Sequence, residues 1–171
     1  MHDGEVSSDG GGRLVVVNLA RQRLELHAGG EVVFACSVST AANGPGEVLN
    51  SECTPRGMHV IEEKIGAGCA PNTVFVGRRP TGEVCTPALR AARPDRDWIV
   101  TRIMWLGGLE PGRNRGGSVD TRARYIYIHG TPEHTPIGVP GSRGCVRLRN
   151  GDVMTLFDLV DVGTRVRIDE A

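Results

Sequence analysis

This chain of 171 residues has few aromatic residues and no net charge. Aromatics make up 4% of it, and the formal net charge is zero because 20 basic residues balance 20 acidic ones. Such a balance provides no dominant basic surface, so we expect no nucleic-acid partner. The apolar run Leu14–Val17 is far too short to cross a bilayer, and we expect no membrane span.

Paired cysteine motifs are also missing. The five cysteines are Cys36, Cys53, Cys69, Cys85 and Cys145, and none belongs to a C-x-x-C pair. A zinc ribbon and a thioredoxin-type site are therefore disfavoured. The first four would form two disulfides in an exported protein. We favour buried free thiols instead, because disulfide frameworks occur mainly in smaller secreted chains.

No phosphate-binding loop and no export leader can be identified. The glycine-rich segment Gly107–Asp120 lacks the sequence G-K-[ST]. It is interpreted as a loop, either a simple connection between strands or a mobile flap over a site. The first residues lack the charged and apolar regions of a signal peptide. As it stands, the sequence favours a cytoplasmic location, and a mature form in the periplasm or cell envelope is the alternative.

The length favours a single domain with a core of its own. Residues 1–12 are acidic and glycine-rich, which predicts a disordered tail, and residues 13–171 are expected to form the domain. The 24 glycines favour a mainly β, turn-rich fold over a helical bundle.

Alternating or β-branched apolar runs predict a series of short strands, of which the first three form an antiparallel meander. The predicted strands are Arg13–Leu19, Arg23–His27, Glu31–Thr40, Gly57–Lys64, Thr73–Gly77, Trp98–Leu106, Arg124–His129 and Arg165–Ile168.

Helices are expected in two places only. Residues 86–95 are compatible with one helical turn. Asn150 is predicted to cap a longer helix that runs to about Val160, and the apolar stripe of this helix consists of residues at helical spacing, namely Val153, Leu156, Phe157 and Val160.

The residues suited to chemistry gather in the segment 125–148. His129 ends a predicted strand, and Cys145 follows Gly144, with a helix expected to begin just after it. A neighbouring imidazole or a helix N-terminus lowers the pKa of a thiol, and uncrowded amides beside Gly144 suit an oxyanion. The pair therefore fits acyl transfer. On spacing alone, however, a histidine and a cysteine sixteen positions apart are more often a structural histidine and a buried thiol.

The order of motifs resembles one known family. Residues 128–131 read I-H-G-T and residues 142–147 read S-R-G-C-V-R. This pattern closely resembles the active-site signature of the L,D-transpeptidase catalytic domain, also called the YkuD-like family. Residues 14–40 look like the first strands of that family, and residues 54–57 are similar to its T-P-x-G turn. The resemblance extends over residues 13–168.

The resemblance implies a β-sandwich with one short helix after the cysteine, and a cysteine acyltransferase that acts on peptidoglycan stem peptides in the cell wall. Cys145 would attack the carbonyl of the third, L-configured residue, and terminal D-alanine would leave. His129 would act as base and then as acid, with its ring held by the carbonyl of Gly130. The amides of Gly144 and Cys145 would stabilise the oxyanion. No metal and no cofactor is implied, and inhibition by carbapenems is expected.

One position departs from the family pattern. Many members have S-H-G-C where this chain has Arg143, which either binds a substrate carboxylate or is simply exposed. Arg147 matches a family position and is expected to support the loop or to bind a carboxylate. Ser142 is expected to orient the loop by hydrogen bonding. Tyr127 either lines the substrate cleft or packs in the core.

The leading hypothesis is an L,D-transpeptidase that transfers the acyl group to an amine. The alternatives are an L,D-carboxypeptidase that transfers it to water during recycling, and a non-catalytic cell-wall-binding module. Zinc bound by His129, His134 and Cys145 matches no strong pattern. His59 is expected to be structural or exposed, and both tryptophans are expected to pack in the core.

Overall fold

The computed structural model describes residues 12–171, so nearly all of the predicted tail lies outside the described residues. The described chain is mainly β, as predicted. The strands are β1 (Arg13–Asn18), β2 (Arg23–Ala28), β3 (Glu31–Ser37), β4 (Gly57–Ile65), β5 (Thr73–Val76), β6 (Arg79–Val84), β7 (Val100–Gly108), β8 (Tyr127–Gly130), β9 (Val146–Leu148) and β10 (Arg165–Asp169). The helices are α2 (Pro87–Ala92), the 3-10 helix η1 (Gly117–Val119) and α3 (Asn150–Leu159).

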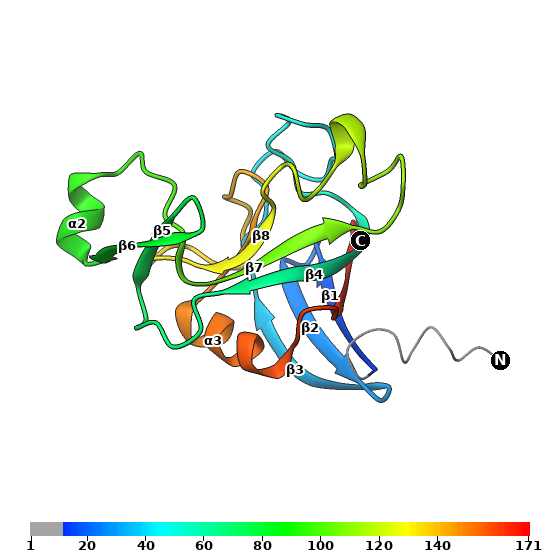
Figure 1. Ribbon diagram of the computed structural model, residues 1–171, viewed down its shortest axis with the longest axis horizontal. Helices are drawn as coiled ribbons and strands as arrows, with labels where there is room; N and C mark the ends of the chain where they lie inside the picture. The colour runs from blue at the N-terminus through cyan, green and yellow to red at the C-terminus, as the bar shows by residue number, and fades with distance from the viewer. Residues whose placement is uncertain (1–11) are drawn as a thin grey trace.

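The strands form one continuous sheet in the order β3-β2-β1-β10-β4-β7-β5-β6, and β8 and β9 continue from β7. Strands β1 to β3 pair antiparallel, which confirms the predicted meander. Two pairs are parallel, β1 with β10 and β8 with β9. In Figure 1, β5, β6 and α2 project at one end of the molecule, while α3 lies against β7 and β8.

One large apolar cluster joins the distant parts of this sheet. Its buried side chains come from β1, β2, β3, β4, β7, β8, β9, β10 and α3. The sheet therefore curls around its core, and α3 closes one side. Each large aliphatic side chain that is fully buried there stabilises the fold by about 1.5–3 kcal/mol. The predicted stripe of α3 is confirmed, since its members are all buried, namely Val153, Leu156, Phe157 and Val160.

The strand boundaries differ from the prediction mainly at β3, β7 and β8. Strand β3 ends at Ser37, three residues earlier than predicted. Strand β7 begins and ends two residues later than predicted, so that the predicted loop 107–120 loses its first two residues to the sheet. Strand β8 begins only at Tyr127, because residues 121–125 form a turn in which Tyr125 has a φ of 57°. Tyr125 therefore does not lie on the strand that carries His129.

The prediction around Cys145 was wrong in one respect. Strand β9 follows the cysteine, and helix α3 begins only at Asn150. A helix N-terminus is therefore not available to lower the pKa of the thiol. Asn150 is also not the cap, since the N-cap is Arg149 and no side-chain hydrogen bond caps the helix. Strands β6 and β9 were not predicted.

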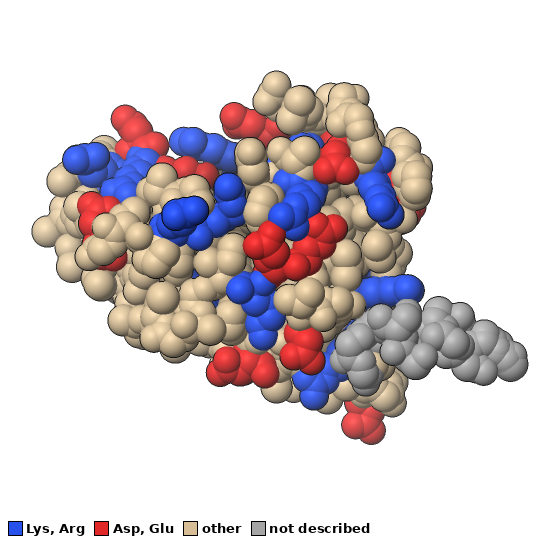
Figure 2. All heavy atoms as spheres, viewed as in Figure 1, with Lys and Arg blue, Asp and Glu red and all other residues tan. Residues whose placement is uncertain are grey.

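All five cysteines are free thiols in the structure, as the sequence favoured. Only Cys36 and Cys85 are buried, whereas Cys53, Cys69 and Cys145 are partly exposed. Basic and acidic side chains lie beside one another over the face shown in Figure 2. No helix among residues 12–171 is long and apolar enough to cross a membrane.

Candidate functional site

Cys145 lies in the short connection between the loop 131–144 and strand β9. The backbone before it takes a conformation that favours glycine, because Gly144 has a φ of 131°. A Cβ atom on Gly144 would lie 3.0 Å from Cδ1 of Ile126 and 3.1 Å from the carbonyl oxygen of Cys53. The glycine thus permits the close packing that fixes the backbone at the cysteine.

The loop 41–56 supports Cys145 from behind. Thr54 is fully buried, and its hydroxyl donates to the carbonyl oxygen of Gly144 at 2.9 Å. The same hydroxyl accepts from the amide of Ala41 at 3.0 Å. Thr54 belongs to the T-P-x-G motif that the sequence already singled out, and its hydroxyl links that motif directly to the cysteine loop.

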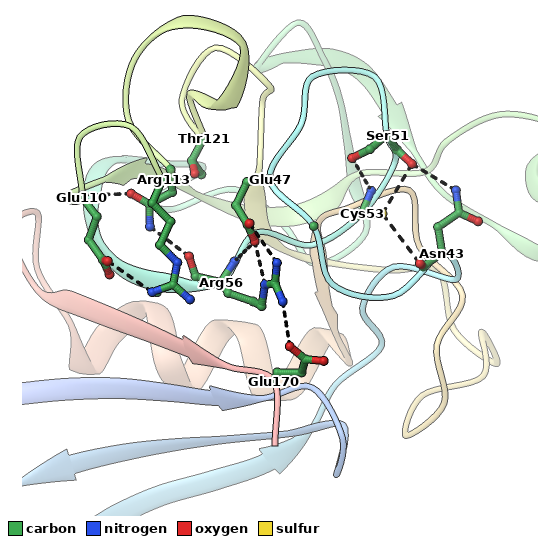
Figure 3. Close-up of polar contacts among 12 residues, drawn as sticks. Asn43, Glu47, Ser51, Cys53, Arg56, Glu110, Arg113, Thr121 and Glu170 are labelled. Carbon is green, nitrogen blue, oxygen red and sulfur yellow. Dashed lines mark hydrogen bonds and ion pairs between the residues drawn. The ribbon is translucent and has the colours of Figure 1, made fainter.

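Figure 3 shows how this loop is tied to the sheet. The guanidinium of Arg56 bridges two carboxylates, with Glu47 at 2.9 Å and Glu170 at 2.7 Å. Cys53 lies farther along the loop, with its sulfur 3.6 Å from the carbonyl oxygens of Asn43 and Ser51. The ion pairs anchor the loop to the end of β10, which fixes the position of Thr54.

His129 lies on β8 with only 1% of its surface exposed. Its Nδ1 lies 2.6 Å from the carbonyl oxygen of Gly130. Since a carbonyl only accepts, Nδ1 carries the proton and Nε2 is left as the basic nitrogen. A Cβ atom on Gly130 would lie 2.5 Å from Oδ1 of Asn150 and 2.7 Å from the carbonyl oxygen of Val100, so glycine is required here.

The parallel pairing of β8 with β9 brings His129 and Cys145 together. Ile128 is opposite Val146 and His129 is opposite Arg147, which places Cys145 level with Tyr127. The two side chains line the same cavity of about 260 Å³. Residues that are separated by a loop in the sequence thus meet because their two strands are neighbours.

Both members of this pair are neutral at pH 7. Burial raises the pKa of the Cys145 thiol to about 12, and burial lowers the pKa of His129. Hydrogen bonds fit this state, since the thiol donates to the carbonyl oxygen of Tyr125 at 3.4 Å. The amide of Tyr127 donates to the sulfur at 3.3 Å. The resting site therefore holds a thiol and a free imidazole nitrogen rather than an ion pair.

Ser142 organises the turn in front of the cysteine. Its hydroxyl donates to the carbonyl oxygen of Cys145 at 2.6 Å and accepts from the amide of Gly144 at 3.1 Å. The Gly144 amide is therefore engaged within the loop in this structure. No hydrogen bond from the Cys145 amide is found within residues 12–171.

The predicted arginines both line the cavity, in different ways. Arg143 is exposed. Arg147 donates to the carbonyl oxygen of Gly141 at 3.0 Å and pairs with Asp97 at 3.4 Å. Tyr127 is buried and also lines the cavity, with its hydroxyl 3.2 Å from Nη1 of Arg78.

Three charged residues of the cavity were not identified from the sequence. Arg78 comes from the turn between β5 and β6, Asp97 precedes β7, and Arg124 lies in the turn before β8. Arg124 is half-buried and donates to the carbonyl oxygen of Cys53 at 2.7 Å, so it joins the loop 41–56 to the site. A lone arginine or aspartate in a polar segment carries no local signal that would have identified any of them.

His59 and His134 do not line this cavity. His59 is fully buried, and its ring nitrogens are 3.0 Å from the Gly57 carbonyl oxygen and 2.9 Å from the Thr121 hydroxyl. It is structural, as expected, and burial lowers its pKa to about 4. His134 is exposed. Residues 12–171 contain no group of three or more ligands suited to a metal ion.

A family model for the L,D-transpeptidase catalytic domain matches residues 12–168. A probable L,D-transpeptidase, ErfK/SrfK from Salmonella typhimurium, is 56% identical over 156 residues, which cover 90% of this chain and 43% of that relative. The probable L,D-transpeptidase YcfS from Escherichia coli is 49% identical over 157 residues, with the same two coverages, 90% and 43%. The chain thus spans less than half the length of these curated relatives.

Solved structures agree on the fold. One match is L,D-transpeptidase 3 from Mycobacterium tuberculosis in complex with a faropenem-derived adduct, with a TM-score of 0.57 and 16% identity. The superposition covers 92% of this chain and 60% of the matched chain. An L,D-transpeptidase from Enterococcus faecium has a TM-score of 0.55 at 15% identity, covering 91% and 49%. At these identities the likeness concerns the fold.

Proposed function

Because this chain belongs to the L,D-transpeptidase catalytic domain family, a family of enzymes, we propose that it is a cysteine acyltransferase acting on peptidoglycan stem peptides. Residues 13–171 would form the catalytic domain. The observation that carries the proposal is the single cavity that both Cys145 and His129 line. The hydrogen bond from His129 to Gly130 supports it, since that bond leaves Nε2 free to accept a proton.

The first half-reaction transfers the acyl group to the enzyme. As the sulfur of Cys145 attacks the carbonyl carbon of the third stem residue, Nε2 of His129 takes the thiol proton. The Cys145 amide donates a hydrogen bond to the oxyanion and stabilises it. The Gly144 amide gives up its hydrogen bond to the Ser142 hydroxyl and donates to the oxyanion as well. The C–N bond then breaks, His129 returns the proton to the leaving amine, and D-alanine departs from a thioester.

The second half-reaction releases the acyl group. An amine loses a proton to His129 as it attacks the thioester carbonyl, the C–S bond breaks, and the proton passes to the sulfur of Cys145. With an amine of a second stem peptide or of a D-amino acid, the product is a new amide. With water, the product is a free tripeptide, which is the carboxypeptidase reaction.

A two-arm incubation tests the proposal and separates the two reactions. The protein is incubated with a tetrapeptide stem, with and without a D-amino acid acceptor, and the products are identified by mass spectrometry. We expect the exchanged tetrapeptide in the arm that contains the acceptor. Tripeptide alone in both arms would refute transfer to amines, and unchanged tetrapeptide in both arms would refute acyl transfer altogether.

Carbapenem-type compounds provide a second test of the same site. Solved relatives include a structure in complex with imipenem and an avibactam carbamoyl enzyme. We expect the thiol of Cys145 to open a carbapenem ring by the same attack, and the adduct to be absent from Cys145→Ala.

A further inference from the structure

Arg78 occupies an unusual place at the mouth of the candidate active site. It forms the tight turn between β5 and β6 together with Gly77, and both residues have positive φ values, 64° for Arg78 and 57° for Gly77. Such a two-residue hairpin turn favours glycine, asparagine or aspartate. A left-handed conformation costs a non-glycine residue about 1 kcal/mol or more, and strain of this kind gathers at functional sites.

Aromatic rings hold the guanidinium of Arg78 in place. It lies over Trp105 at 4.7 Å and over Tyr125 at 5.1 Å, and Nη1 donates to the hydroxyl of Tyr127 at 3.2 Å. Contacts with ring faces fix the plane of the guanidinium while leaving its edge for hydrogen bonds. The side chain is half-buried and lines the cavity that contains Cys145.

No carboxylate within residues 12–171 forms an ion pair with Arg78. A second arginine, Arg122, also lies over Trp105 at 3.9 Å, but it is paired with Glu62 and Glu63. Within residues 12–171, the bond to Tyr127 is the one hydrogen bond of Arg78, and it has no ion pair. The guanidinium therefore faces the cavity with most of its five donors free.

The strand register places His129 to one side of the sulfur, two residues beyond Tyr127. The guanidinium contacts Trp105 and Tyr127, which are level with the sulfur, and its contact with Tyr125 extends it toward the other side. Trp105 is opposite Tyr127 in the pairing of β7 with β8, and His129 is opposite Ile103, two residues farther along. Cys145 is level with Tyr127. The leaving amine must lie within reach of His129, so the retained acyl part of the donor extends toward the end where Arg78 lies.

We propose that Arg78 binds a free carboxylate on the acyl part of the donor peptide and so makes the enzyme selective for stems that are not amidated there. This inference rests on the proposed function. The carboxylate belongs either to the second stem residue or to the side chain of the third. Both present the same planar anion, which a guanidinium binds through two parallel hydrogen bonds.

Three donor tetrapeptides test the inference on the wild-type protein. One has free carboxylates on its second and third residues, one is amidated at the second and one at the third. Formation of the acyl-enzyme and release of D-alanine give kcat/KM for each. We expect kcat/KM to be roughly 10- to 100-fold lower for one of the amidated donors, mainly because its KM is higher. The position of the amide in that donor identifies the carboxylate that Arg78 binds.

Two variants assign the selectivity to Arg78. Arg78→Met keeps apolar contact with Trp105 but removes the charge, and we expect its ratio of kcat/KM between the free and the amidated donor to fall to about one. The adjacent Arg79 is exposed and does not line the cavity, so Arg79→Met is the matched control and should keep the wild-type ratio.

Equal kcat/KM for the three donors on the wild-type protein would overturn the inference, and this comparison decides even if Arg78→Met does not fold. A ratio that persists in a folded Arg78→Met variant would also overturn it. Donors that all fail to acylate Cys145 would instead refute the proposed function, and the inference with it.

Discussion

The protonation state of Cys145 allows a quantitative prediction. Burial raises the pKa of this thiol to about 12, whereas an exposed cysteine has a pKa of about 8.5. At pH 7 the thiolate fraction is therefore roughly 3,000-fold smaller than that of a free cysteine. A thiolate of higher pKa is intrinsically the better nucleophile, with a Brønsted coefficient of about 0.4–0.5. The higher nucleophilicity of the Cys145 thiolate therefore compensates for roughly 30- to 50-fold of the difference in thiolate fraction. Alkylation of Cys145 should thus be about 100-fold slower than that of N-acetylcysteine.

Iodoacetamide labelling from pH 5 to pH 10.5 measures this rate. Peptide mapping separates Cys145 from the other four thiols, and the logarithm of its rate constant should rise by one unit for each pH unit up to at least pH 10. A proton-accepting His129 does not hold a thiolate at rest, so His129→Gln should change this profile little below pH 9. A rate that is flat between pH 6 and pH 8, and that falls sharply in His129→Gln, would refute the neutral pair.

Three further predictions concern residues around the site. The pKa of His59 is lowered to about 4 in the fold and is about 6.5 in the unfolded chain. Roughly 3 kcal/mol of the free energy of unfolding should therefore be lost as the pH falls from about 6.5 to about 4. The free energy of unfolding of His59→Gln, measured with urea, should depend less steeply on pH. Thr54→Val leaves the Gly144 carbonyl and the Ala41 amide unpaired and should lower the free energy of unfolding by about 1–3 kcal/mol, together with kcat. Arg143→His should keep activity in the tetrapeptide assay, and an inactive variant would show that this position is not tolerant.

The fold was predictable wherever local pattern and burial agree. Strands β1 and β2 alternate buried side chains with more accessible ones, and the stripe of α3 has helical spacing. Strand β9 is only three residues long, and β6 is polar and contains Pro80, so each exists because a neighbouring strand pairs with it. Such pairing leaves no trace in the local sequence.

The sequence motif predicted the central residues of the site, but it did not predict the side-chain contacts that surround them. Gly144 and Cys145 share a short motif, and the family pattern supplied His129. Asn150 reads as a helix cap from its position alone. In the structure its side chain accepts from Thr101 at 2.6 Å and donates to Asn72 and Glu133, contacts that only the fold reveals.

The most direct test of the account is intact-protein mass spectrometry of the wild-type protein and of Cys145→Ser after exposure to a tetrapeptide stem without acceptor. We predict that the wild-type protein gains the mass of one tripeptide acyl group while D-alanine appears in solution, and that hydroxylamine removes this thioester. We predict that Cys145→Ser gains no thioester. No gain on the wild-type protein, with D-alanine retained on the stem, or an equal gain on both proteins would contradict Cys145 as the nucleophile.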